Sequence, residues 1–138
     1  MRYMLIMRST PEAEEAMKEV PFDEVVTHMG RYNEELINAG VMVAGEGLAP
    51  PEDGGFVVDF SADPPAVRDG AVGEAAVLFN GFWILEVATR DEAIGWATKC
   101  PLGPGIKLEV RRVPTIDEFP PDNEYVQKEK AWREKLKI

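Results

Sequence analysis

The sequence is poor in the residues that build covalent and metal-centred sites: its 138 residues include one cysteine, Cys100, and one histidine, His28. A single cysteine excludes an internal disulfide, and one cysteine with one histidine excludes the usual zinc-binding spacings. Basic residues are also outnumbered, 15 against 25 acidic ones, for a formal net charge of −10. Because nucleic-acid backbones and anionic membranes repel an acidic surface, we expect neither as a partner.

Long hydrophobic runs are absent as well. Every apolar run is shorter than ten residues, which excludes an ordinary transmembrane helix. Residues 1–8 meet a charge too early for a secretory signal and are typical of a strand instead. With the lone cysteine, these features predict a cytoplasmic protein. Core material is present, since 45% of the residues are hydrophobic, and the length suits a single folded unit.

Apolar periodicity predicts strands that alternate with helices. The helices are marked by Thr10-Pro11, a cap followed by proline, and by Thr89-Arg90-Asp91-Glu92, which fits a capping box. Between residues 60 and 80, Asp63-Pro64-Pro65 and Arg68-Asp69-Gly70 punctuate a long excursion that is typical of a short edge hairpin. The strands are expected at residues 3–7, 41–48, 56–60, 82–87 and 106–111, and the helices at 11–19, 22–39 and from 89 to just before Pro101.

The main order is β-α-β-β-α-β, with a small insertion after the third strand. Two right-handed βαβ-like halves give a four-stranded antiparallel sheet with helices on one face, so we expect an α+β, ferredoxin-like protomer over residues 1–113. Several strands are apolar on both faces, but the helices cover only one. The uncovered face therefore predicts a homodimer.

Residues 114–138 are expected to form a separate linker and helical arm. A stiff acidic linker leads to a helix from Asn123, in which Tyr125, Trp132 and Leu136 form a narrow apolar stripe. Residues 128–138 hold five basic and two acidic residues, a net of +3 in an acidic chain. Because such a helix is marginal alone in water, we expect the arm to dock on the acidic body or on a neighbouring subunit.

Two residues could carry proton transfer. His28 lies mid-helix near the edge of the apolar stripe, where an imidazole that titrates near neutrality suits a general base. The alternative is a histidine at a helix–sheet boundary whose nitrogens are satisfied by backbone or water. Asp69 precedes Gly70, and Asp-Gly is first of all a turn signal. Its functional interpretation is a partner that holds one tautomer of His28.

Other polar and aromatic residues have competing structural roles. Glu46 lies between two glycines, which suits either a ligand site or a simple strand exit. Trp83 could line a pocket, although aromatic residues at strand spacing are usually core. Glu86 is expected to pair with Arg111 or Arg112. We expect Cys100 to be inert and Asn80-Gly81 to form a turn.

Several segments of residues 1–113 occur in a familiar order: Arg2-Tyr3-Met4-Leu5-Ile6, His28, Gly45-Glu46-Gly47-Leu48, Asp69-Gly70, Gly81-Phe82-Trp83-Ile84-Leu85-Glu86 and Asp91-Glu92-Ala93. In these segments the sequence resembles the YCII-related family, specifically its DGPF branch. The resemblance implies a dimeric α+β barrel. This sequence has Ala71-Val72 where the branch has Pro-Phe. Loss of the proline gives the turn after Asp69-Gly70 more conformational freedom, and loss of the phenylalanine removes an aromatic ring from the site that the resemblance implies. A few relatives look like small-molecule lyases that use a histidine and an aspartate, and some accompany sigma factors in their genomes.

Two functions follow from these residues. The first is a small-molecule binder or general acid–base enzyme of the lyase or isomerase type, with His28 and Asp69 as catalytic residues and Glu46 and Trp83 as substrate-binding residues. It requires no metal and no organic cofactor. The second is a non-catalytic interaction or regulatory protein that uses the dimer surface and the C-terminal arm. The residues alone leave open whether the protein is an enzyme.

Overall fold

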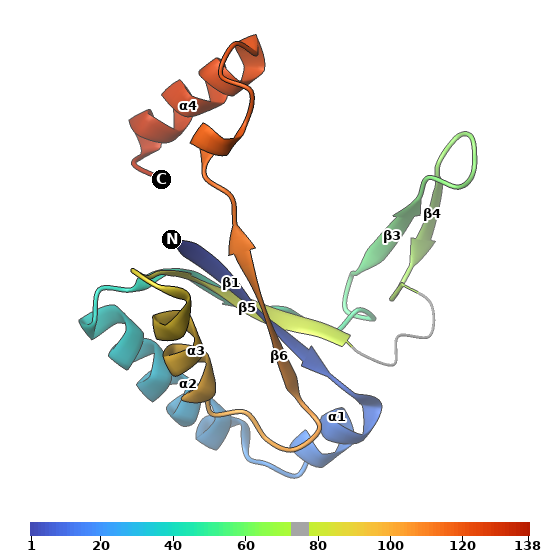
Figure 1. The fold of residues 1–138 in the computed structure, drawn as a ribbon. Helices are drawn as coiled ribbons and strands as arrows, with labels where there is room; N and C mark the ends of the chain where they lie inside the picture. The colour runs from blue at the N-terminus through green and yellow to red at the C-terminus, as the bar shows by residue number, and fades with distance from the viewer. Residues whose placement is uncertain (73–77) are drawn as a thin grey trace.

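The computed structural model describes residues 1–72 and 78–138 (Figure 1). Nowhere in these ranges is a helix long and apolar enough to cross a membrane. The elements are β1 (Arg2–Ser9), α1 (Pro11–Met17), α2 (Phe22–Asn38), β2 (Met42–Gly47), β3 (Phe56–Asp59), β4 (Ala66–Asp69), β5 (Leu78–Glu86), α3 (Arg90–Thr98), β6 (Lys107–Val113), a 3-10 turn η1 (Ile116–Glu118) and α4 (Glu124–Leu136).

Four strands form one antiparallel sheet in the order β2-β5-β1-β6. The first strand in the chain is central: Leu5 of β1 lies opposite Trp83 of β5 on one side and Val110 of β6 on the other. The mixed α+β architecture, with an antiparallel sheet and four helices in the described ranges, is consistent with the predicted ferredoxin-like fold.

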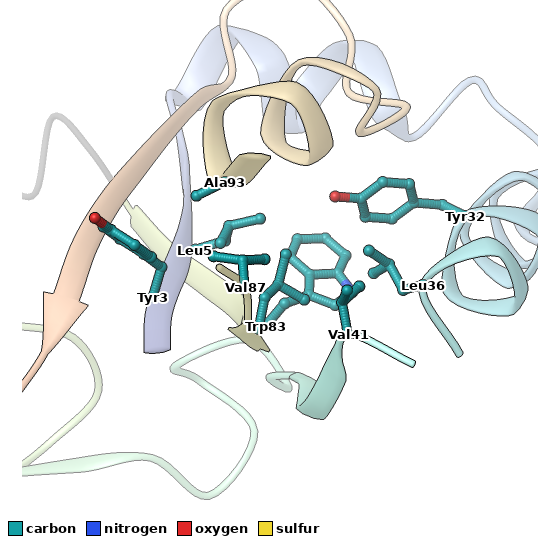
Figure 2. Close-up of a cluster of buried hydrophobic side chains, with 9 residues drawn as sticks. Tyr3, Leu5, Tyr32, Leu36, Val41, Trp83, Val87 and Ala93 are labelled. Carbon is teal, nitrogen blue, oxygen red and sulfur yellow. The ribbon is translucent and has the colours of Figure 1, made fainter. Parts of the chain in front are cut away.

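The core lies between one sheet face and the helices α2 and α3 (Figure 2). Alternation along β1 places Tyr3 and Leu5 on this face, where Leu36 of α2 and Ala93 of α3 cover them. Met4 therefore points to the opposite face. The buried cluster consists of Tyr3, Leu5, Tyr32, Leu36, Val41, Trp83, Leu85, Val87 and Ala93.

The predicted helix starts are confirmed by their caps. The Thr10 hydroxyl accepts a hydrogen bond from the Ala13 N–H at 3.2 Å, and Pro11 is the first residue of α1. At α3, the Thr89 hydroxyl accepts from the Glu92 N–H, and the Glu92 carboxylate accepts in return from the Ala88 N–H. These contacts fix where α1 and α3 leave the sheet.

The predicted third strand is in the wrong sheet. Residues 56–60 were expected in the main sheet, followed by an insertion, but β3 pairs with β4 in a separate two-stranded sheet. The insertion thus follows the second strand of the main sheet and includes the predicted third strand. The longer β5 takes that place because it forms ladders with both β1 and β2. Figure 1 shows the β3–β4 hairpin standing away from the main sheet.

The predicted turn at Asn80-Gly81 is also wrong, since both residues lie inside β5. The glycine serves a close backbone approach: a Cβ added at Gly81 would lie 2.9 Å from the carbonyl oxygen of Glu46 on β2. The register of β1 against β5 shifts between Met7 and Arg8, at this same end of the pair.

The C-terminal extension contains the predicted helix. The Asn123 side chain accepts a hydrogen bond from the Tyr125 N–H at 2.9 Å and so caps α4. Within the helix no residue is buried, and Trp132 is 53% exposed. The helix is tied to its own linker by an ion pair between Lys130 Nζ and Asp117 Oδ1 at 2.9 Å. Figure 1 shows α4 beyond the end of β6, away from α2 and α3.

Candidate functional site

Two adjoining hollows lie between α2 and the sheet. The larger hollow has a volume of about 640 Å³ and is enclosed by α1, the first half of α2 and the loops around residues 48–52 and 101–106. The smaller hollow, of about 300 Å³, lies along β2 and β5. Met7, Val25 and Met29 line both hollows, so the two share a wall. Volumes in this range suit small-molecule ligands.

His28 lines the larger hollow from α2. Its side chain is 53% exposed, and its Nε2 lies 3.7 Å from Oε1 of Glu24, one helical turn earlier. The imidazole is therefore reached both by solvent and by the hollow. A carboxylate beside one ring nitrogen can favour one tautomer and leave the other nitrogen for proton transfer.

Asp69 lies elsewhere in the chain. It belongs to β4, pairs with Phe56 across the hairpin and lines neither of the two hollows. In the described part of the chain, no hydrogen bond or ion pair joins Asp69 to His28. A single chain therefore does not bring the two predicted catalytic residues together.

Glu46 and Trp83 both line the smaller hollow, but the register pairs Gly45 with Trp83 and Glu46 with Phe82, so the Glu46 and Trp83 side chains lie on opposite faces of the sheet. The Trp83 ring is held by two contacts: its Nε1–H donates to Asn33 Oδ1 at 2.8 Å, and its ring meets Tyr32 edge to face at 5.6 Å. Gly45 gives the ring room, because a Cβ there would lie 2.9 Å from Trp83 Cδ1. The glycine before Glu46 thus serves the packing of Trp83.

A polar pair in the larger hollow was missed by sequence reasoning. The Asn80 Nδ2–H donates a hydrogen bond to Glu14 Oε1, and both side chains are partly buried. The sequence predicts a turn at Asn80, and Glu14 has no signal of its own beyond being an acidic residue in the first turn of α1. Glu14 and Met17 are three residues apart, so they lie on the same face of the predicted helix. This spacing could indicate that Glu14 faces the hollow, but only after Asn80 has been placed in a strand.

The remaining predicted residues have structural surroundings. Burial raises the pKa of the Cys100 thiol to about 12, which keeps it protonated at neutral pH, as expected of an inert cysteine. Glu86 pairs with Arg2, at 3.2 Å, rather than with Arg111 or Arg112. The reason is register, since Arg2 lies directly opposite Glu86 on β1. In the described ranges, no three His, Cys, Asp or Glu side chains gather as a metal site.

Comparison with known families supports one assignment. The family model described as YCII-related domain matches residues 1–115, which include β1 to β6 and both hollows. No curated protein matches the chain significantly. Since the match covers most of the sequence, the chain belongs to the YCII-related domain family.

Proposed function

We propose that the protein binds a small molecule in the two adjoining hollows and that His28 acts there as a general acid or base. The observation that carries this proposal is the half-exposed imidazole on the wall of a largely apolar hollow of about 640 Å³. Elimination or isomerisation requires little more than a proton acceptor beside a bound substrate. We place the chain in the DGPF branch, on the motifs it shares with that branch, and in the cytoplasm.

The other predicted site residues have places in this proposal. Trp83 extends the site along the smaller hollow as a substrate-binding residue, and Glu46 is a second one at the β2 edge of the same hollow. Asp69 lies apart from His28 within one chain, so its catalytic role requires that the β3–β4 hairpin of a second copy bring it to the site. The homodimer is therefore part of the proposal, and the acidic net charge again disfavours nucleic acid as a partner.

The proposal is tested by screening a chemically diverse library for compounds that raise the melting temperature of the full chain. We expect hits whose affinity or turnover falls in His28→Ala, by about 100-fold or more if proton transfer is lost. Arg31→Ala is the matched control, because Arg31 is exposed on the same helix and lines neither hollow. If His28→Ala and Asp69→Asn leave the binding of every hit unchanged, the proposal fails.

A second candidate is a non-catalytic interaction protein. The observation in its favour is the C-terminal arm: Tyr125, Trp132 and Leu136 of α4 remain exposed, and residues 128–138 carry a net charge of +3. Removal of residues 117–138 separates the two functions. Loss of partner capture or of the oligomer would support the interaction role, whereas an unchanged oligomer and unchanged capture would exclude it.

A further inference from the structure

The walls of the larger hollow are adaptable and apolar. Three methionines line it: Met7 from β1, Met17 from α1 and Met29 from α2. The loop before β6 adds Leu102 and Ile106. Methionine side chains are unbranched and polarisable, so they fit ligands of irregular shape. These walls can bury the hydrocarbon part of a ligand, but they do not determine which polar group the ligand carries.

The polar group facing this hollow is the Glu14–Asn80 pair. The Asn80 amide donates one N–H to Glu14 Oε1. Glu14 Oε2 and Asn80 Oδ1 are then left as hydrogen-bond acceptors. Across the residues that the structure describes, neither of these two oxygens receives a hydrogen bond. A ligand that fills the hollow must therefore donate hydrogen bonds here, because a partly buried acceptor without a donor costs free energy.

In the part of the chain that the structure describes, no other charged group of the larger hollow contacts Glu14 directly. Lys18 lies within the electrostatic reach of Glu14 and Glu52, but its direct partner is Glu15, with 2.9 Å between its Nζ and Glu15 Oε2. His28 lies beside Glu24, and Glu52 adds a second carboxylate to the lining. An anionic ligand head would meet Glu14 and Glu52, whereas a cationic head would form a charge-assisted hydrogen bond with Glu14.

We infer that the larger hollow selects ligands with a protonated amine on an apolar body, with Glu14 as the counter-ion and Asn80 as a second acceptor. This inference rests on the proposed function, because it names the class of molecule that the proposed site takes. An ammonium group carries several N–H donors and can satisfy both oxygens at once. The apolar remainder then lies against the methionine walls.

The test compares three probes with one hydrocarbon body: phenylbutylamine, phenylbutanol and phenylbutyrate, titrated calorimetrically into the full chain at neutral pH. We expect the amine to bind about tenfold tighter than the alcohol, the scale of one charge-assisted hydrogen bond, and the carboxylate to bind most weakly. Glu14→Gln should abolish the advantage of the amine over the alcohol. Glu12→Gln is the matched control, because it removes the same charge from an exposed position of α1 that does not line the hollow.

Three results would overturn the inference: equal affinity for amine and alcohol, an amine preference that survives Glu14→Gln, or no binding of any of the three probes. Asn80→Ala provides an independent check on the β5 side of the pair and should weaken binding of the amine more than binding of the alcohol. If alcohol and amine bind equally well, the ligand class is wrong but the small-molecule site stands. If none of the three probes binds, the ligand class is likewise wrong, while the library screen with His28→Ala still decides the proposed function.

Discussion

Two leucines show how unequally single side chains contribute to the stability of this chain. Leu36 is 0% exposed between α2 and the sheet, whereas Leu136 on α4 is 50% exposed. We expect Leu36→Ala to lower the free energy of unfolding by about 2–5 kcal/mol, because it removes buried surface and leaves a cavity. Leu136→Ala should change it by no more than about 0.5 kcal/mol. Urea unfolding followed by tryptophan fluorescence measures both, and equal losses would contradict the assignment of the core.

At this scale the sequence singles out the imidazole that lines the larger hollow but not the carboxylate of the Glu14–Asn80 pair. A lone histidine stands out in any composition, so His28 is a candidate from the sequence alone, and its catalytic role stays a prediction. Glu14 is one of many acidic residues, and its place in the larger hollow depends on Asn80, which lies 66 positions away in the chain. Contacts between such distant positions are set by the register of β1 against β5, and a single sequence does not reveal that register.

Among the elements, η1 is held to the end of β6 by an ion pair. Arg112 contacts both carboxylate oxygens of Glu118, at 2.7 and 2.8 Å, and the Thr115 N–H donates to the same carboxylate at 2.7 Å. The hydrogen bonds from Arg112 and then from Thr115 lower the pKa of Glu118 from 4.5 to about 2. A carboxylate with a lowered pKa stabilises the folded state above its unfolded pKa. This contribution is lost as the pH falls from about 4.5 to about 2.

We therefore expect the Glu118 carboxyl resonance to titrate with a midpoint near 2 in a carbon-detected NMR experiment. In Arg112→Gln the midpoint should rise toward the ordinary value of 4.5, because the largest cause of the lowered pKa is gone. Arg111→Gln is the control, since it removes the neighbouring arginine of β6 and should leave the midpoint in place. An unchanged midpoint in Arg112→Gln would show that the ion pair does not form in solution.

Elements marked by caps or by apolar periodicity were predicted well. The arrangement of strands, which depends on which strand pairs with which, was not. Caps and apolar periodicity located β1, α2, α3 and β6. The alternation of Phe56, Val58 and Phe60 correctly indicated a strand but could not say which strand it pairs with. In the structure the strand pairs with β4 outside the main sheet, and Phe56, Val58 and Phe60 all remain exposed.

At the scale of the whole molecule, the sheet face opposite the helices is the surface that bears on assembly. We call it the open face; Met4, Ile6, Phe82 and Ile84 lie on it, and the ion pairs Arg2–Glu86 and Arg8–Glu109 lie beside them. An apolar centre with charged groups around it has the anatomy of a protein interface. This arrangement supports the proposed homodimer.

We expect Ile84→Glu to convert the protein to a monomer, because it places a charge in the centre of the open face. Ile94→Glu is the matched control, since Ile94 is an exposed residue of α3 and should leave the dimer intact. Sedimentation velocity over a range of concentrations measures the change, with circular dichroism to verify the fold of each variant. A wild-type chain that sediments as a monomer throughout, or an Ile84→Glu dimer, would exclude this interface.

The central position of β1 determines the order in which the sheet can assemble during synthesis. Arg2 to Ser9 leave the ribosome well before either of their partners, Leu78 to Glu86 and Lys107 to Val113. Pairing across such long stretches of chain is slow to form, because each contact closes a large loop. The nascent chain therefore carries its central strand unpaired until β5 emerges, and only then can the main sheet begin to assemble.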